Sequence, residues 1–330
     1  MFGTFLAMAG EKRKRIGLKR IMSAARKTLP VETYWEEFDP PVEVIAPPGE
    51  ASPLVVSSPH SGSIYPQSFL DHSRLDPLTL RRSEDAYVDE LFAGASVADA
   101  PLLRARFPRA FLDVNREPYE LDPRMFDGRL PPQANTRSIR VAGGLGTIAR
   151  IVSESKEIYK SRLPASEIQK RVSGLYEPYH VSLRSLIESA WSAHGIAVLI
   201  DCHSMPSQQH SGLMFRSGEP ERADIILGDR YGTSCDPRFV GVLESALCRR
   251  GMVVGRNKPY AGGFITENYG SPGLGAHAVQ IEINRALYMD EATLEKRAGF
   301  NDLRDILTGA LAELRAFVQD VSGMMGAAAE

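Results

Sequence analysis

The apolar run Gly195-Ile-Ala-Val-Leu-Ile-Asp201 constrains the fold of this 330-residue chain more than any other feature of its sequence. An unbroken run of this length, bounded by a glycine and an acidic residue, predicts a buried strand. Shorter apolar runs recur along the chain, and segments with helical periodicity separate them. Strands that alternate with helices predict an α/β fold, with a mostly parallel or mixed central sheet flanked by helices.

The expected elements follow one another without an internal repeat. Strands are expected at residues 53–58, 110–114, 195–201, 223–227 and 278–283, and helices at 79–98, 153–194 with interruptions at Pro164 and Pro178, 239–250 and 290–322. No linker divides this pattern, so residues 31–325 are expected to form a single domain. Residues 1–30 carry a short apolar patch and then a basic run, and they are expected to form a basic, disordered tail.

The overall composition argues against several classes of protein. Apolar residues make up 43% and charged residues 24% of the chain, as in soluble globular proteins, and a formal net charge of −2 gives no reason to expect nucleic acid as a partner. The three cysteines have neither paired spacing nor an even number, which predicts reduced thiols in a cytoplasmic protein. No stretch approaches the roughly 18 to 20 apolar residues that a membrane span needs.

Two histidines stand directly after expected strands. In open α/β sheets the ligand site lies beyond the carboxyl ends of the strands, and His60 and His203 occupy such positions among small neighbours. Asp201 precedes His203 by two residues, so strand alternation puts both side chains on one face, where the carboxylate can orient the imidazole. A catalytic zinc ion needs three protein ligands and one open position. We therefore expect His60 and His203 to bind one divalent ion per chain, most simply zinc.

The third metal ligand is expected to be a carboxylate, because no other histidine has a comparable context. The acidic segment of the helix expected at residues 79–98 supplies the best candidates. We favour Asp85, with Glu84 and Asp89 as alternatives, since acids on a partly apolar helix face need a partner. The other interpretation is a solvated acidic face that is balanced by neighbouring arginines.

Glu282 is the candidate general base. It lies in the middle of the strand expected at residues 278–283, where an unpaired buried carboxylate costs several kcal/mol. The alternative role is a structural ion pair with Arg285. Cys202 is a poor candidate nucleophile, because adjacent strand residues point to opposite faces and His203 therefore points away from it.

Arginines cluster around the strand expected at residues 110–114. The planar guanidinium group suits bidentate binding of a carboxylate, so Arg116 is the first candidate for anchoring an anionic substrate, assisted by Asn115. Arg109, Arg140 and Arg150 are candidates for further anion contacts.

Taken together, these motifs resemble the N-formylglutamate amidohydrolase family, whose members have a fold similar to that of zinc carboxypeptidases. The matching stretches occur in one order over residues 53–305, which makes the joint match specific. They are Ser58-Pro-His-Ser-Gly62, Glu84-Asp85 with Val88-Asp89, Leu112-Asp-Val-Asn-Arg-Glu-Pro118, Gly143-Gly-Leu-Gly-Thr147, Leu199-Ile-Asp-Cys-His-Ser-Met205, Pro259-Tyr-Ala-Gly-Gly-Phe264 and Gln280-Ile-Glu-Ile-Asn-Arg285.

The resemblance implies a metal held by His60, an acid in the Asp85 region and His203. It further implies a carboxypeptidase-like base at Glu282, and an Asn115-Arg116 pair that faces the substrate carboxylate. The chain departs from the carboxypeptidase HxxE motif, because Ser63 stands where the acid would follow the first histidine. The implied reaction is hydrolysis of N-formyl-L-glutamate, or of a close N-acylamino acid, to a carboxylate and a free amino acid.

Two other functions compete with this prediction. A metallopeptidase or cell-wall amidase would use the same metal site on a larger substrate, and the residues alone do not select a formyl group over an acetyl group or a peptide. A cavity closed by the loops at residues 128–147 and 205–222 would favour the small substrate, and an open groove would favour a peptide. In a non-enzymatic role the basic N-terminus would bind a membrane or nucleic acid, which leaves the polar strand ends unexplained.

Overall fold

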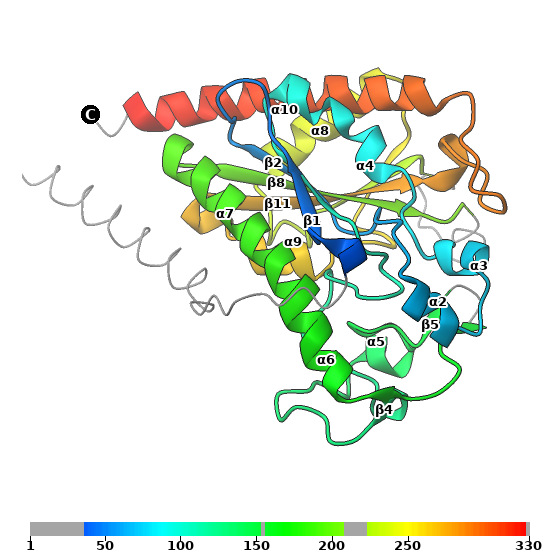
Figure 1. The fold of residues 1–330 in the computed structure, drawn as a ribbon. Coiled ribbons are helices and arrows are strands. Elements are labelled where there is room, and N and C mark those ends of the chain that lie inside the picture. The colour runs from blue at the N-terminus through cyan, green and yellow to red at the C-terminus, as the bar shows by residue number, and fades with distance from the viewer. Residues whose placement is uncertain (1–35, 153–155, 208–222, 328–330) are drawn as a thin grey trace, which may run out of the picture.

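A seven-stranded mixed sheet forms the centre of the structure, a computed structural model that describes residues 36–152, 156–207 and 223–327 (Figure 1). The tail expected at residues 1–30 lies outside the described residues, and the single domain expected over residues 31–325 stays a prediction. Across the sheet the strands are β1 Val42–Ile45, β3 Leu102–Ala105, β2 Leu54–Ser58, β8 Ala197–Met205, β11 Ala276–Asn284, β9 Ile225–Gly228 and β10 Val254–Arg256.

The four central strands β3, β2, β8 and β11 run parallel to one another. At the edges, β1 pairs antiparallel with β3, and β9 pairs antiparallel with β11. Strands β8 and β11 are each nine residues long and buried along their whole length, and they pair in register from Ala197 with Ala276 to Met205 with Asn284. The prediction of a mostly parallel or mixed sheet flanked by helices is therefore confirmed.

Helices cover both faces of the sheet (Figure 1). On one face α10 packs on α8 and α4, and on the other face α7 and α9 pack against the central strands, which gives two hydrophobic cores. The helices are α2 Gln67–His72, α3 Pro77–Arg81, α4 Val88–Leu91, α5 Ile139–Ala142, α6 Ser166–Arg171, α7 Glu177–His194, α8 Pro237–Arg249, α9 Phe264–Tyr269 and α10 Phe300–Ala327. Short two-stranded sheets pair β4 Phe126–Asp127 with β7 Leu163–Pro164, and β5 Ile151–Val152 with β6 Lys156–Glu157.

Local sequence explains where the long helices begin and end. Helix α8 begins after Asp236, whose carboxylate accepts a hydrogen bond from the backbone N–H of Arg238, and Pro237 fits the first turn because a first-turn N–H has no helical partner. Helix α7 ends at Gly195, which adopts a positive φ of 69° that favours glycine. Among the described residues, no helix is both long and apolar enough to cross a membrane.

The helix expected at residues 79–98 is wrong as a continuous element. Helix α3 ends at Arg81, residues 82–87 form a turn, and α4 then begins after Tyr87, which has a φ of 64°. The backbone carbonyls of Arg82 and Glu84, which a continuous helix would use internally, instead accept hydrogen bonds from the guanidinium group of Arg285. The side chain of Arg285, which directly follows β11, therefore replaces helical hydrogen bonds in this turn.

The strand expected at residues 110–114 is also wrong, because these residues form a buried loop. Its backbone bonds to side chains rather than to a neighbouring strand: the carbonyl of Phe111 accepts a hydrogen bond from Arg171, and the carbonyl of Val114 accepts one from His180. The strand that joins the sheet is β3, eight residues before the expected start. Apolar residues and burial are common to both conformations, so the sequence pattern does not separate them.

The remaining expected elements differ mainly in their bounds. Strands β2, β8, β9 and β11 and helices α7, α8 and α10 all occur, and α10 begins at Phe300 rather than at residue 290. Pro178 does not interrupt the helical region, because it lies in the first turn of α7, directly after a π-helical segment at Val172–Tyr176. The helical region begins at Ser166 rather than at residue 153, because residues 156–157 and 163–164 lie in the short strands β6 and β7. Residue 153 itself lies outside the described residues.

His180 links the long helix α7 to the loop at residues 110–114. Its ring contacts Tyr269 Oη through Nδ1 at 2.9 Å and donates from Nε2 to the backbone carbonyl of Val114 at 2.9 Å. Burial lowers the pKa of His180 to about 4, so the imidazole stays neutral in the folded protein. In the unfolded chain the same group has a pKa near 6.5, so the unfolded state binds more protons between about pH 6.5 and 4.

We therefore expect the free energy of unfolding to fall as the pH is lowered through this window, with His180 contributing a loss of about 2 kcal/mol at pH 5. Glutamine retains a donor for the Val114 carbonyl without titrating, so His180→Gln should remove that part of the pH dependence. Urea unfolding of both proteins at pH 7.5 and pH 5 measures it, with His72→Gln at an exposed histidine as the control. Equal pH dependence in His180→Gln and the wild type would contradict the assignment.

Candidate active site

The carboxyl ends of β2, β8 and β11 open into one cavity of about 730 Å³. The structure brings together in its lining eight of the residues that the sequence analysis proposed for the site. These are His60, Asp85, Arg109, Asn115, Arg116, Arg140, His203 and Glu282. Arg150, the further candidate for anion binding, instead pairs with Asp122 and Glu157.

The register between strands β8 and β11 fixes the relative positions of the site residues that these two strands carry. Asp201 and His203 lie two residues apart on β8, and Gln280 and Glu282 lie opposite them on β11, with paired Cα positions. All four side chains share the face of the sheet that α7 and α9 cover. Cys202 points to the other face, where it is buried in the core beneath α8 and α10. The sequence-based prediction that Cys202 faces away from the site is confirmed.

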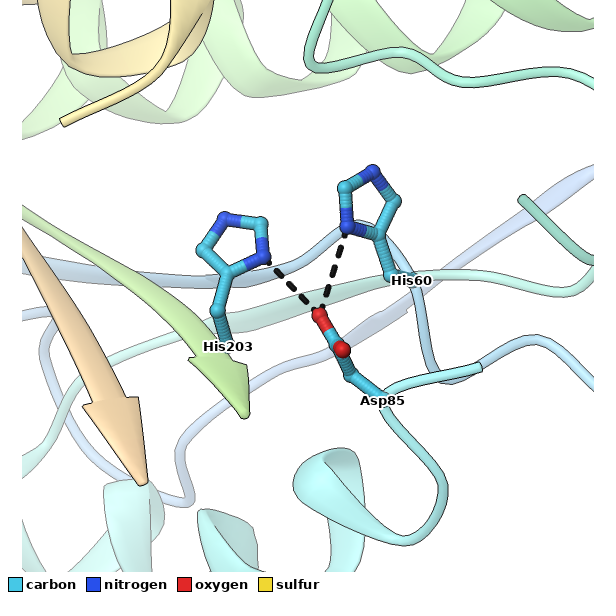
Figure 2. Close-up of side chains that lie close together, drawn as sticks. All are labelled: His60, Asp85 and His203. Atoms are coloured by element: carbon cyan, nitrogen blue, oxygen red, sulfur yellow. Dashed lines mark hydrogen bonds and ion pairs between the residues drawn. The ribbon is translucent and has the colours of Figure 1, made fainter. Parts of the chain in front are cut away.

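His60, Asp85 and His203 form a compact buried cluster (Figure 2). Both imidazoles turn Nδ1 toward the same carboxylate oxygen: Asp85 Oδ2 lies 3.3 Å from His60 Nδ1 and 3.0 Å from His203 Nδ1. One candidate ligand atom of each residue lies within 4.8 Å of those of the other two. All three side chains are buried, which shields the cluster from bulk water.

A second carboxylate holds the outer nitrogen of each imidazole. His60 Nε2 lies 2.7 Å from Asp113 Oδ1, and His203 Nε2 lies 3.0 Å from Asp201 Oδ2. Burial lowers the pKa of His203, but the carboxylates of Asp201 and Asp85 outweigh it and hold that pKa well above its usual value. The contact with Asp201 is the one that strand alternation predicted, whereas Asp113 was not assigned this role from the sequence.

The cluster fits a divalent zinc ion. A tetrahedral zinc ion about 2.0–2.1 Å from each ligand atom places those atoms about 3.4 Å apart, close to the separations between Asp85 Oδ2 and the two Nδ1 atoms. Two imidazoles and one carboxylate leave a fourth position open, as catalytic zinc sites require. Hydrogen bonds from the outer nitrogens to carboxylates are the usual support of metal-binding histidines.

Asp85 reaches this position because its other oxygen is fixed. Asp85 Oδ1 accepts hydrogen bonds from Ser204 Oγ at 3.2 Å and from Arg285 Nη2 at 3.0 Å. Burial raises the pKa of Asp85, but the hydrogen bonds of His203 and His60 outweigh it, so that pKa lies well below its usual value. Asp85 is therefore an ionised carboxylate that points between the two histidines.

The two alternative acids point elsewhere. Glu84 pairs with Arg81 at 3.1 Å and accepts a hydrogen bond from Tyr65 Oη at 2.8 Å. Asp89 pairs with Arg104 at 2.6 Å. Because Asp85 lies in the turn and Asp89 in helix α4, the expected shared helix face does not exist. Geometry alone therefore leaves Asp85 as the acid in the cluster.

Glu282 projects into the same cavity from β11. Burial raises its pKa to about 7, against the opposing effect of His203. Its Oε1 accepts a hydrogen bond from Gln280 Nε2 at 2.7 Å, while the expected alternative partner Arg285 pairs with Asp85 instead. The pKa values of two neighbouring carboxyl groups thus shift in opposite directions, a pattern typical of acid–base sites.

The arginines around Asp113 form a cationic wall of the cavity. Arg109 Nη2 donates to Asp113 Oδ2 at 2.8 Å, and Arg116 Nη2 lies 3.6 Å from the same oxygen. Arg116 is further fixed by hydrogen bonds to two backbone carbonyls. Arg140 is half-exposed and lies 3.9 Å from Glu120. This wall presents guanidinium groups that are held in place before a ligand arrives.

Several lining residues were not assigned a role from the sequence. They include Asp113, Ser204, Tyr260, Gln280 and Arg82. The alternation of Gln280 with Glu282 is a signal that could have placed Gln280 on the site face. The sequence offers no comparable signal for Asp113, because its orientation depends on the loop at residues 110–114 rather than on a strand.

Comparison with known proteins agrees with this site. A family model described as N-formylglutamate amidohydrolase matches residues 52–289. An N-formylglutamate deformylase from Pseudomonas putida is 30% identical over 245 residues, which cover 72% of this chain and 82% of the relative. An N-formylglutamate deformylase from Pseudomonas aeruginosa is 27% identical over 243 residues, which cover 72% of this chain and 83% of that relative.

Two solved structures also resemble this chain. The crystal structure of an N-formylglutamate amidohydrolase from Ralstonia eutropha JMP134 superposes with a TM-score of 0.79 at 36% identity, covering 85% of this chain and 99% of the other. A gene product of Agrobacterium tumefaciens, Atu2144, shares the fold at 19% identity, with a TM-score of 0.55 and coverage of 88% and 96%. The first of these structures shares both sequence and fold over most of the chain.

The backbone passes so close to Asn115 at Gly263 that this position excludes a side chain. A Cβ atom at Gly263 would overlap the amide group of Asn115, which accepts a hydrogen bond from the backbone N–H of Ile265 and lies 3.2 Å from His203 Nε2. The backbone of Gly263 is extended, so alanine adds the Cβ without backbone strain. Gly263→Ala therefore tests the position of Asn115, together with the hydrogen bond that the Gly263 N–H donates to Gln280.

We expect Gly263→Ala to lower kcat/KM for amide hydrolysis by about tenfold or more, because displacement of Asn115 disturbs its neighbours in the cavity. Steady-state kinetics measure the effect. Gly273→Ala is the matched control, since a Cβ there meets nothing within 4 Å. Unchanged kinetics in Gly263→Ala would show that the position of Asn115 does not matter for the reaction.

Proposed function

The chain belongs to the N-formylglutamate amidohydrolase family, and we propose that it hydrolyses the amide bond of N-formyl-L-glutamate or of a closely related N-acylamino acid. The products are formate, or another carboxylate, and the free amino acid. The observation that carries this proposal is the cavity, in which a two-histidine, one-aspartate cluster lies beside a buried glutamate and several arginines. These groups supply what hydrolysis of an anionic amide requires.

His60, Asp85 and His203 would hold one zinc ion, through Nδ1 of each histidine and Oδ2 of the aspartate. When bound, zinc supplies a Lewis acid for the acyl carbonyl and lowers the pKa of a water molecule to near neutrality. Asp113 and Asp201 orient the two imidazoles by holding their outer nitrogens.

Glu282 acts as the general base and then as the general acid. It takes a proton from the attacking water and passes it to the nitrogen of the leaving amine, which departs as the free amino group. A pKa raised by burial favours both steps, because the group then exchanges a proton near neutral pH. The hydrogen bond from Gln280 to Oε1 leaves Oε2 for this exchange.

Arg116 anchors the α-carboxylate of the substrate, with Asn115 beside it. Two backbone carbonyls fix the Arg116 guanidinium, so little side-chain freedom is lost when the substrate binds. Arg109 and Arg140 add positive potential on the same wall. Such a wall favours amides that carry a free carboxylate over neutral amides.

The size of the cavity supports a small substrate. A volume of about 730 Å³ lies within the range of small-molecule sites, roughly 300–1,000 Å³. The loop at residues 128–147 contributes Arg140, Gly143, Leu145 and Gly146 to the lining. Residues 208–222 of the second expected loop lie outside the described residues. On this basis we prefer the N-acylamino acid to a peptide substrate.

Metal analysis tests the proposed cluster. We expect one zinc ion per chain in the purified protein, and we expect His60→Ala and His203→Ala each to lose both bound metal and activity while circular dichroism stays unchanged. His72→Ala, at an exposed histidine, is the matched control. Full activity in a metal-free preparation would rule out the mechanism. A panel of formyl-, acetyl- and peptidyl-amino acids then identifies the acyl group.

Glu282→Gln separates catalysis from metal binding. Glutamine keeps the shape and the hydrogen bond of the side chain but cannot move a proton, so we expect kcat to fall by about 10²- to 10⁴-fold. Bound metal should remain at the wild-type level. Glu244→Gln, in a surface ion pair with Arg256, should keep full activity. If Glu282→Gln kept wild-type kcat, the proton-transfer role would be excluded.

A further inference from the structure

Arg82 lines the cavity without an acidic partner. It follows helix α3 and lies three residues before Asp85 in the turn at residues 82–87. Among the described residues, no carboxylate lies within ion-pair distance of its guanidinium group, and its buried Nε donates no hydrogen bond. Its backbone is engaged, because the N–H donates to the carbonyl of Thr79 and the carbonyl accepts a hydrogen bond from Arg285.

The other arginines of the cavity all have acidic partners. Arg109 pairs with Asp113, Arg116 lies near the same carboxylate, and Arg140 lies near Glu120. Arg285 is fully engaged, because its three nitrogens donate to Ser204 Oγ, to two backbone carbonyls and to Asp85. Arg82 is therefore the one cavity arginine, within the described part of the chain, whose charge nothing nearby balances.

The charge balance of the cavity favours an anionic ligand with more than one carboxylate. Five arginines line it against three carboxylates, Asp85, Asp113 and Glu282. A guanidinium nitrogen that is buried without a partner is costly unless a ligand supplies an acceptor. The planar donor fork of arginine matches a carboxylate, with two parallel hydrogen bonds. Within the described lining of the cavity, Arg82 supplies an unmet donor of that chemistry.

The position of Arg82 sets it apart from the anchor at Arg116. The two nitrogens of the His60 ring face opposite ways, Nδ1 toward Asp85 and Nε2 toward Asp113. Arg116 lies on the Asp113 side, whereas the backbone of Arg82 is tied through Arg285 to the Asp85 side. A ligand with two carboxylates could therefore engage both arginines across the metal cluster.

We propose that Arg82 is a second carboxylate anchor of this cavity, which binds the carboxylate that Arg116 does not hold. This inference rests on the proposed function for the place of the first carboxylate. The second carboxylate belongs either to the side chain of the amino acid or to a dicarboxylic acyl group. Arg82 determines specificity for dianionic over monoanionic ligands and takes no part in proton transfer.

Ligand binding tests the anchor without any need for catalysis. Isothermal titration of the metal-loaded enzyme compares straight-chain dicarboxylates with monocarboxylates of the same chain length. We expect the wild type to bind a dicarboxylate more tightly than the monocarboxylate of the same chain length. Arg82→Gln should weaken binding of the dicarboxylate by about 10- to 100-fold and leave binding of the monocarboxylate unchanged. Arg82→Lys should keep part of the preference, and Arg304→Gln, in a surface pair on α10, should keep all of it.

A wild type without preference for dicarboxylates would overturn the proposal, and so would a preference that survives in Arg82→Gln. Kinetics then distinguish the two sources of the carboxylate. If it belongs to the side chain, Arg82→Gln lowers kcat/KM for N-formylglutamate relative to N-formylglutamine. If it belongs to the acyl group, the same variant lowers kcat/KM for N-succinylglutamine relative to N-acetylglutamine. Equal losses on all four substrates also overturn the proposal.

The two proposals fail in different ways. If the wild type hydrolyses none of these amides, the proposed function fails, while the dicarboxylate titration still reports on Arg82. If the amides are hydrolysed but Arg82→Gln leaves every preference unchanged, only the anchor at Arg82 fails. Thermal unfolding of Arg82→Gln checks that the turn at residues 82–87 keeps its stability.

Discussion

A single carboxylate oxygen, Asp85 Oδ2, faces the Nδ1 atoms of both His60 and His203, and the rest of the site is arranged around this contact. Asp113 and Asp201 close the row at either end, so that carboxylates and imidazoles alternate. Buried carboxylates are stable only when donors or cations meet them, and each member of this row has at least one partner among its neighbours. Within the described residues, Asp201 Oδ1 is the oxygen of the row that has no hydrogen-bond partner. The same alternation points three ligand atoms at one place, which is what a metal site needs.

The loops that complete the row are held by side chains rather than by regular backbone pairing. Arg285, which directly follows β11, binds the carbonyls of the turn at residues 82–87, and His180 and Arg171 bind those of the loop at residues 110–114. Such loops can adopt the orientation that the site requires, because they are not tied to the geometry of a helix or a strand. The sheet and the long helix α7 supply the rigid frame on which these contacts depend.

Charge divides the cavity into parts with different tasks. In the proposed mechanism, the His60–Asp85–His203 cluster and Glu282 provide the reactive centre, and the arginines around Asp113 form a wall that attracts an anionic substrate. Asp113 belongs to both parts, because one of its oxygens holds His60 and the other holds Arg109. The proposed mechanism therefore couples binding of the substrate to orientation of a metal ligand through one buried carboxylate.

Sequence patterns alone identified four of the seven strands of the sheet, β2, β8, β9 and β11, and the residues that they carry. Side chains alternate along a strand, so the pattern alone placed His203 beside Asp201 and Glu282 on the face of the site. It failed for the broken helix at residues 79–98 and for the loop at residues 110–114, where local periodicity is the same in both conformations.

Two features of the site depend on tertiary packing: which acid lies between the two histidines, and which carboxylate contacts the outer nitrogen of His60. Asp85 is oriented by Arg285, 200 residues away along the chain, and Asp113 meets His60 across 53 residues. Periodicity reports on neighbours within a few residues, whereas these contacts exist only once distant segments have packed together. The family resemblance indicated the region of Asp85. Within that region, the contact with Arg285 orients Asp85 toward the two histidines.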